Sequence, residues 1–251
     1  TAFTYTANIF RRNPMREKPV RPKYNNCTTC SLRAGTIFAG LDDEGALQLE
    51  NMLRRLTYPE GFVLFLKGEK PRGVYCVCGG RVKLYLNSPD GRNAVLGYAL
   101  PGSVIGVRAI LSGKPHDFTA RTVEESRLSF IDKDDFMALL KRNGGVCLRL
   151  AETLGEELSK AYEGFGNAAL ATSEERLASL LLRLCDEFGE PSPEGIVIKP
   201  GLSQEEIADM AGMSRRTLSR ALRSLRKMKL VECGRRTTVI RNRAALEKLL
   251  S

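Results

Sequence analysis

The side chains of this chain with the most distinctive chemistry are its seven cysteines and its single histidine. Cys27 and Cys30 form a Cys-x-x-Cys pair. Cys76 and Cys78 alternate within a β-rich segment, which places them on one face of a strand. Thiols so spaced bind zinc or an iron–sulfur cluster, or exchange with disulfides. We treat all four as candidate sensor residues and Cys27 and Cys30 as candidate metal ligands. The alternative for Cys76 and Cys78 is packing as small core residues.

The remaining reactive side chains do not resemble an enzyme site. Any histidine-based triad must use His116, because the chain has no other histidine. The sequence contains no Gly-x-Ser-x-Gly, His-Glu-x-x-His or phosphate-binding-loop motif. We therefore expect a protein that is not an enzyme. Cys147, Cys185 and Cys233 fall on apolar faces of expected helices or strands and are predicted to pack.

A second group of residues has the chemistry of nucleic-acid recognition. Residues 202–220 read LSQEEIADMAGMSRRTLSR, which predicts two short amphipathic helices around a turn at Gly212. Ser203 and Glu206 have the spacing of a capping box, and Ser214 is a suitable N-cap for the second helix. The outer side of that helix carries arginine, serine and threonine, which hydrogen-bond phosphates and base edges. The pattern is typical of a helix-turn-helix that inserts a recognition helix into the major groove.

The residues after this motif predict a basic wing. Residues 230–233 and 237–240 have the composition of two strands, joined by Gly234, Arg235 and Arg236. Residues 202–243 hold eleven Lys or Arg against four Asp or Glu, and residues 1–25 hold six against one. Because positive charge concentrates where phosphate would bind, we expect double-stranded DNA as a partner. The predicted DNA-binding residues are Ser203, Ser214, Arg215, Arg216, Thr217, Ser219, Arg220, Arg235 and Arg236.

The elements that must position these groups can be outlined from the hydrophobic pattern. Short β-rich runs alternate with glycines over residues 58–130, which predicts a sandwich or jelly roll. A preceding helix is indicated by Ala46, Leu49, Leu53 and Leu56 at helical spacing. Residues 173–188 predict a capped helix, residues 191–195 a loop and residues 196–198 a short strand.

A long helix is predicted from about residue 144 to residue 169. Its apolar residues, spaced by three and four, form a narrow stripe of the coiled-coil kind: Cys147, Leu150, Leu154, Leu158, Ala161, Phe165 and Ala168. A partner helix from a second copy of the chain would cover such a stripe, which predicts a homodimer. The alternative is a helix packed on its own domain.

The order of a β-roll, a long helix and a winged helix resembles the Crp/Fnr family of bacterial transcription regulators. Residues 74–106 resemble the roll core of that family, and residues 202–242 resemble its DNA reader. The resemblance implies an α+β fold: an N-terminal β-roll (a jelly roll of the cyclic-nucleotide-binding kind), a long dimerisation helix and a C-terminal winged helix-turn-helix. We expect a basic arm with the Cys-x-x-Cys pair at 1–37, the sensor roll at 38–131, the linker and dimerisation helix at 132–169 and the winged helix at 170–251.

The family resemblance also implies how the DNA would be read. Family members are typically homodimers that bind a palindromic site and contact RNA polymerase. By resemblance, Arg215, Arg216 and Arg220 occupy base-reading or phosphate positions, and Arg220 matches an arginine that reads guanine. Many members have glutamate where this chain has Arg216, so a different half-site is expected. The alternative function is a cytosolic small-ligand-binding module or scaffold with a degenerate DNA reader.

The resemblance leaves the sensed signal open. Cyclic-nucleotide binders of the family carry a Gly-Glu pair and an Arg-Ser pair, whereas this chain has Val107 after Gly106 and His116-Asp117 at the second position, so cAMP is not expected. The oxygen-sensing branch places two further cysteines after the first pair, and the late one corresponds to Ser129. An iron–sulfur cluster completed by Cys76 and Cys78, zinc, and a thiol switch all remain alternatives.

The sequence also predicts where the protein works. No apolar run approaches the about 18 residues of a spanning helix, and the first residues lack a secretory apolar region. We therefore expect a cytoplasmic protein with no membrane contact and with free thiols rather than a disulfide framework.

Overall fold

The computed structural model describes residues 27–87, 93–198, 202–234 and 237–250. The described residues fall into two compact units. The first holds those up to Leu86 together with Leu96–Leu154, and the second holds those within Asn87–Val95 and Gly155–Ser251. The division therefore falls inside the long helix.

The first unit begins with two 3-10 turns and a short α-helix, followed by the strands of the roll. The turns are η2 (Cys27–Thr29) and η3 (Ser31–Gly35), and the helices are α2 (Asp43–Met52), α3 (Val107–Ser112) and α4 (Lys133–Arg142). The strands are β1 (Arg54–Tyr58), β2 (Val63–Phe65), β3 (Gly73–Gly79), β4 (Val82–Asn87), β5 (Asn93–Ala99), β6 (Val104–Ile105), β7 (Thr119–Thr122) and β8 (Ser126–Asp132).

Two four-stranded sheets, ordered β1-β8-β3-β6 and β2-β7-β4-β5, make up the roll. Their described pairings are antiparallel. Both sheets contribute side chains to one apolar core, which includes Phe65, Val77, Val82, Ala120 and Leu128. Burial of this shared core explains why the alternating β-rich runs form two packed sheets. The predicted β-roll is confirmed.

A second apolar core covers the opposite face of the β1-β8-β3-β6 sheet. Val74 and Ile131 from that sheet pack there with Leu49 of α2, Phe136 of α4 and Leu150 of the long helix. Because side chains alternate along a strand, Val77 faces the first core while Val74 and Cys76 face the second.

The helix predicted to extend to Leu56 is shorter than expected. α2 ends at Met52, and Leu53 has extended backbone angles with φ of −79° and ψ of 127°. Leu56 lies in β1, opposite Leu128 of β8. Helical spacing alone did not reveal this end, because pairing with a strand distant in sequence determines the conformation of β1.

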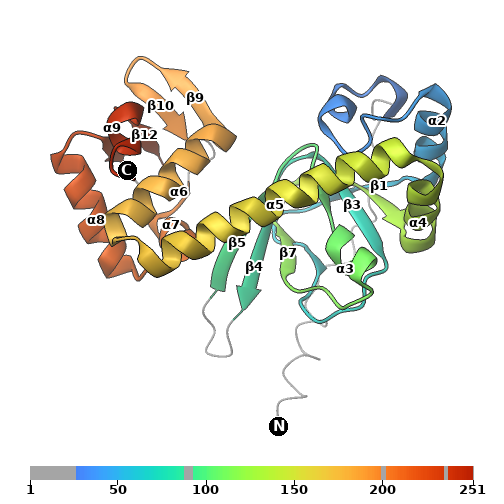
Figure 1. Ribbon diagram of the computed structural model, residues 1–251, viewed down its shortest axis with the longest axis horizontal. Coiled ribbons are helices and arrows are strands. Elements are labelled where there is room, and N and C mark those ends of the chain that lie inside the picture. Colours follow the sequence, from blue (N-terminus) through green and yellow to red (C-terminus); the bar gives the residue numbers. More distant parts are fainter. Residues whose placement is uncertain (1–26, 88–92, 199–201, 235–236, 251) are drawn as a thin grey trace, which may run out of the picture. The chain divides into compact units, whose positions relative to one another are not determined.

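The long helix α5 (Gly144–Leu170) is confirmed, and Figure 1 shows it in yellow without a break. The stripe predicted along it is wrong in its first part. Leu150 is 5% exposed, and Leu154 packs against the same core of the first unit. Among the side chains of α5 that the structure describes, the exposed large apolar ones are Leu148, Leu158 and Tyr162, at 63%, 53% and 69%. The start of α5 thus packs on its own unit.

The second unit contains a helical core and a small sheet. Its elements after α5 are α6 (Ser173–Phe188), β9 (Gly189–Ser192), β10 (Gly195–Ile198), α7 (Gln204–Met210), α8 (Arg215–Lys227), β11 (Val231–Cys233), β12 (Thr238–Ile240) and α9 (Arg243–Glu247). The sheet order is β11-β12-β10-β9. Leu181 of α6, Leu225 of α8 and Ile240 of β12 are each at most 1% exposed, so helices and sheet share a dry interior.

Part of the loop predicted at residues 191–195 is a strand. Pro191 lies in β9, opposite Ile196 of β10. A proline lacks the amide hydrogen, and β9 is the edge strand of its sheet, where that loss costs little. None of the helices in the described part of the chain combines the length and the mean hydropathy of a membrane-spanning segment.

Candidate nucleic-acid interface

The helix-turn-helix is built by local capping, as its sequence predicted. The Ser203 hydroxyl accepts a hydrogen bond from the Glu206 amide at 3.2 Å, and a Glu206 carboxylate oxygen accepts from the Ser203 amide at 2.9 Å. This reciprocal pair satisfies amides that would otherwise lack partners at the start of α7. Gly212 adopts a left-handed conformation with φ of 61°, which turns the chain toward α8.

The cap of α8 is also confirmed. The Ser214 hydroxyl accepts from the Thr217 amide at 3.1 Å and lies 2.9 Å from the Thr217 hydroxyl. The hydroxyls of Ser203, Ser214 and Thr217, all predicted as DNA-binding, are therefore engaged in positioning the two helices in this structure.

The two sides of α8 differ sharply in chemistry. Its inner side is buried and consists of Leu218, Ala221, Leu222 and Leu225. Its outer side exposes the predicted Arg215, Arg216, Ser219 and Arg220, and also Arg223 and Lys227, which the sequence analysis missed. The sequence could have revealed them, because residues 216, 220, 223 and 227 are separated by four, three and four positions and therefore share one face of a helix. We call Arg215, Arg216, Arg220, Arg223 and Lys227 the cationic face.

The cations of this face are available to bind anions. Within the described residues, none of the five forms an ion pair with a carboxylate. Elsewhere arginines are neutralised internally: Arg81 lies 2.9 Å from Glu124, and Arg243 lies 2.6 Å from Asp186. Unpaired guanidinium groups in a row along one helix provide the charge and the donors that a phosphate backbone and guanine edges accept.

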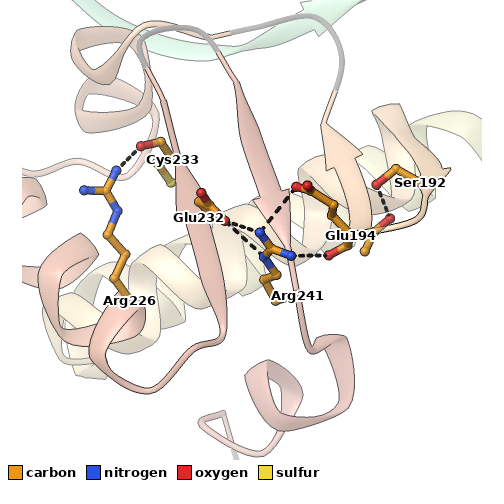
Figure 2. Close-up of polar contacts among 7 residues, drawn as sticks. Ser192, Glu194, Arg226, Glu232, Cys233 and Arg241 are labelled. Carbon is orange, nitrogen blue, oxygen red and sulfur yellow. Dashed lines mark hydrogen bonds and ion pairs between the residues drawn. The ribbon is translucent and has the colours of Figure 1, made fainter.

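The wing next to α8 is held by two arginines outside the cationic face. Figure 2 shows Arg226 reaching from the last turn of α8 to the backbone oxygen of Cys233, to which it donates a hydrogen bond. Arg241 forms ion pairs with Glu232 and with Glu194, the latter at 3.3 Å. At the tip, the Gly234 amide donates to the Thr237 oxygen at 2.7 Å. The predicted DNA-binding residues Arg235 and Arg236 lie outside the described residues.

The candidate sensor cysteines come together on the roll. Arg55, Ser129 and Cys76 are aligned across β1, β8 and β3, so their side chains share one face of the sheet. The Cys78 thiol lies 3.3 Å from the Ser129 hydroxyl. The Cys27 sulfur accepts a hydrogen bond from Arg55 at 3.6 Å. The structure therefore brings Cys27 to the face that carries Cys76 and Cys78, a meeting that the sequence could not establish.

Burial favours the protonated form of two of these thiols, Cys27 and Cys76. Burial raises the pKa of Cys27 to about 11, although the hydrogen bond from Arg55 opposes the shift. Burial, with smaller contributions from Cys78 and Cys27, raises the pKa of Cys76 well above its usual value. The amide of Cys30 donates to the Cys27 oxygen at 3.4 Å. In the part of the chain that is described, no three His, Cys, Asp or Glu side chains are arranged to hold a metal ion.

The other cysteines are placed mainly as expected. Cys185 and Cys233 are buried, which confirms packing. Cys147 is exposed, so its predicted packing is wrong. The reason is the rotation of α5, which turns Val146 and Leu150 toward the core instead.

The segment around His116 and Asp117, which by resemblance would correspond to the phosphate-binding part of a cyclic-nucleotide site, is built around an aromatic stack. The buried imidazole of His116 stacks on Phe65 with ring centroids 3.7 Å apart. Burial lowers the pKa of His116, although Glu69 and Asp117 oppose the shift, so the ring is neutral near pH 7. Arg108 lies 3.2 Å from Asp117 and is therefore already paired with a carboxylate.

The fold and the cationic face together define a class: DNA-binding transcription regulators that join a cyclic-nucleotide-binding-like roll to a helix-turn-helix. Residues 55–143 match the family model described as the cyclic nucleotide-binding domain, and residues 175–249 match the Crp-like helix-turn-helix domain. The chain belongs to the Crp/Fnr family.

Named relatives agree with this assignment. The chain is 28% identical over 190 residues to the CRP-like cAMP-activated global transcriptional regulator of Mycobacterium tuberculosis, covering 76% of this chain and 84% of that protein. It is 29% identical over 219 residues to the cyclic AMP receptor protein of Thermus thermophilus, covering 87% and 98%. The structure of FixK2 from Bradyrhizobium japonicum has the same fold, with a TM-score of 0.69 at 24% identity, covering 79% and 98%.

Proposed function

We propose that this regulator acts as a homodimer and binds a palindromic promoter site with one α8 helix in each half-site. The cationic face of α8 is the observation that carries the proposal, because its guanidinium groups are exposed and form no ion pair within the described part of the chain, while the opposite side of the helix is buried. Like charges in such a row repel one another, and a DNA major groove supplies both phosphates and acceptor edges for them.

Sequence preference is assigned to a subset of the cationic face. On the strength of the family resemblance, we assign Arg215, Arg216 and Arg220 to base edges or phosphates, and Arg220 to guanine through O6 and N7. The positions of Arg223 and Lys227 farther along α8 suit contacts with the phosphate backbone. An arginine at 216 cannot accept a hydrogen bond from cytosine as glutamate does, which supports a half-site different from that of glutamate-bearing relatives.

The proposed dimer seam is the exposed apolar line of α5. Leu148, Ala151, Gly155, Leu158 and Tyr162 are separated by three, four, three and four residues, and all five are exposed. This spacing is that of the a and d positions of a two-stranded coiled coil. A twofold pairing along this line would bury these side chains and would present two α8 helices to successive turns of DNA.

The side chains of His116 and Asp117 support an effector other than cAMP. A cyclic phosphate needs a cation or a row of donors. The stacked His116 ring is uncharged, and the neighbouring Asp117 would repel an anion. We infer that the roll responds to a different signal.

We propose the thiols of Cys27, Cys30, Cys76 and Cys78 as the redox-responsive part of the roll. Three of them, Cys27, Cys76 and Cys78, lie over one face of the β1-β8-β3-β6 sheet. The start of α5 packs against the apolar core on that same face. Two such thiols would lose two electrons and two protons to a low-molecular-weight disulfide, forming one S–S bond and releasing two small thiols. In this scheme Cys27→Ser with Cys30→Ser abolishes redox dependence of DNA binding, and an unchanged response in that variant would contradict it.

An iron–sulfur cluster or a zinc ion does not fit these residues as they are placed. Four ligands are the usual requirement, and although Cys27, Cys76 and Cys78 share one face, no three His, Cys, Asp or Glu side chains among the described residues are arranged to hold a metal ion. The Cys27 sulfur also accepts a hydrogen bond from Arg55, and burial favours its protonated form.

The remaining parts of the proposal follow from family membership. We assign RNA polymerase as the protein partner, the cytoplasm as the location, and no enzymatic activity. The rival function is a small-ligand-binding module or scaffold whose degenerate helix-turn-helix no longer recognises a specific DNA sequence.

Selection of bound sequences from a random duplex DNA pool separates the two functions. We expect recovery of a palindrome with half-sites about one DNA turn apart. A footprint on that sequence should show protection of both half-sites. Recovery of no preferred sequence, with binding that is insensitive to salt, would favour the rival module.

A further inference from the structure

Arg226 looks like one more phosphate-binding cation when only its position on α8 is considered. It is exposed, and it lies three residues after Arg223 of the cationic face. Its guanidinium has another partner, however: it donates a hydrogen bond to the backbone oxygen of Cys233, the last residue of β11. Figure 2 shows this contact spanning from the helix to the strand that leads into the wing.

The opposite end of β11 is attached to α8 by the main chain. Lys229 adopts a left-handed conformation with φ of 56°, and the Leu230 amide then donates to the Leu225 oxygen at 3.0 Å. This turn fixes where β11 begins. The contact made by Arg226 fixes where β11 ends, so the strand is attached to the recognition helix at two points. These two attachments join β11 to α8 at both of its ends, and its pairing with β12 carries the constraint to the rest of the wing.

The outer side of the wing is held separately. Glu232 is exposed between the buried Val231 and Cys233, and it forms an ion pair with Arg241. Arg241 also pairs with Glu194 at 3.3 Å, which joins the wing to the β9–β10 hairpin. In Figure 2, Arg226 and Arg241 approach β11 from opposite sides. Arg241 and its two glutamates therefore hold the wing to the β9–β10 hairpin, while the Arg226 side chain joins β11 to α8.

We propose that Arg226 is a positioning residue that holds the wing strands at a fixed angle to the recognition helix. The proposal rests on the proposed function, because the angle matters when α8 and the wing contact one duplex together. A planar guanidinium with several donors suits this task, since it can bond a carbonyl oxygen while its charge stays exposed. The contribution of Arg226 to DNA binding is thus geometric and differs from that of Arg223.

The test compares Arg226→Met with the matched variant Arg223→Met in the full chain. Hydrogen–deuterium exchange of the free protein is measured for peptides covering residues 231–240 and for peptides covering α8. Affinities are measured for the operator selected by the wild-type protein and for a scrambled duplex, each at several salt concentrations. The exchange measurement needs no DNA and reports the attachment directly.

We expect Arg226→Met to speed exchange in residues 231–240 at least threefold while α8 stays protected, and Arg223→Met to leave both unchanged. We expect Arg226→Met to lower affinity for the operator more than for the scrambled duplex. Arg223→Met should lower both affinities equally and reduce the salt slope by about 0.9 for each lost phosphate contact. Unchanged exchange in Arg226→Met, or equal losses on both duplexes, would overturn the proposal.

A substitute variant and a control on the proposed function complete the test. If Arg226→Met fails to fold, Arg226→Ala replaces it, because alanine favours the helix and cannot donate to the Cys233 oxygen. Wild-type exchange and wild-type operator affinity in that variant would contradict a positioning role, and faster exchange in residues 231–240 would support it. A wild-type protein with no operator preference would refute the proposed function, while the exchange comparison would still decide the role of Arg226.

Discussion

The imidazole of His116 lies flat against the ring of Phe65, with planes inclined by 11° and centroids 3.7 Å apart. His116 is 5% exposed and stands where cyclic-nucleotide-binding relatives are expected to carry an arginine. The stack places an uncharged, buried ring at the position where a cyclic phosphate would need a cation. The same relationship makes the stability of the roll sensitive to acid.

Acid should destabilise the roll through His116. Burial lowers the folded-state pKa of this ring below its unfolded value of 6.5, so the neutral form is favoured in the fold. The resulting stability is present above about pH 6.5 and is lost as the pH falls through the lower folded pKa. We expect His116→Phe, which keeps an aromatic ring against Phe65, to flatten the fall in unfolding free energy just below pH 6.5. Urea titrations between pH 5 and 8 would measure it, and identical profiles for both proteins would contradict the assignment.

Cys27 should react slowly in the folded protein. Its pKa is raised from 9.0 to about 11, so its thiolate fraction at pH 8 is roughly a hundredfold below that of an unfolded chain. We expect alkylation of Cys27 at pH 8, followed by mass spectrometry of its peptide, to be slower in the native protein by about that factor. Arg55→Met removes a contact that lowers this pKa, and it should slow the reaction further. Equal rates in native and urea-unfolded protein would contradict the burial of this thiol.

The features that sequence predicted well are local. The Ser203–Glu206 capping box, the Ser214 cap and the left-handed Gly212 each depend on a few neighbouring residues, and all three are present. The roll was predictable because its strands alternate in hydrophobicity between glycine-rich turns. The family assignment then followed from the order of the elements.

The features that sequence missed depend on contacts between distant segments. The strand at Leu56 forms because β8 is available to pair with it. The face of α5 that packs inward is set by the core around Phe136, so apolar spacing alone did not show that Leu150 and Leu154 pack there while Leu158 is exposed. The approach of Cys27 to Cys76 requires the sheet register, and the partner of Arg226 is a backbone oxygen that no side-chain pattern marks.

The proposed dimer seam can be tested with two leucines of α5. Leu158→Arg places a charge on the exposed line, and we expect it to give monomers by light scattering and to abolish operator binding with little loss of monomer stability. Leu150→Ala instead removes a side chain from the core of the first unit and should cost about 2–5 kcal/mol of unfolding free energy. A Leu158→Arg protein that remains dimeric would show that the seam lies elsewhere.

The wing and the far end of α8 should contribute affinity without specificity. We expect Arg235→Ala, chosen from the sequence, and Arg223→Ala each to weaken binding to all duplexes by a similar factor. Each lost phosphate contact should reduce the slope of log affinity against log salt by about 0.9. Mobility shifts at several salt concentrations measure this slope. A base-specific effect of either variant would mean that its side chain reads sequence rather than phosphate.

Operator binding by Arg220→Ala tests the central claim, recognition through the cationic face of α8, most directly. The affinities of this variant and of wild type are compared on the selected operator and on every single-base change within one half-site. If Arg220 reads one guanine, the variant loses about 1–3 kcal/mol on the intact operator and loses its preference at one base pair only. Full affinity with an unchanged base preference would contradict the central claim.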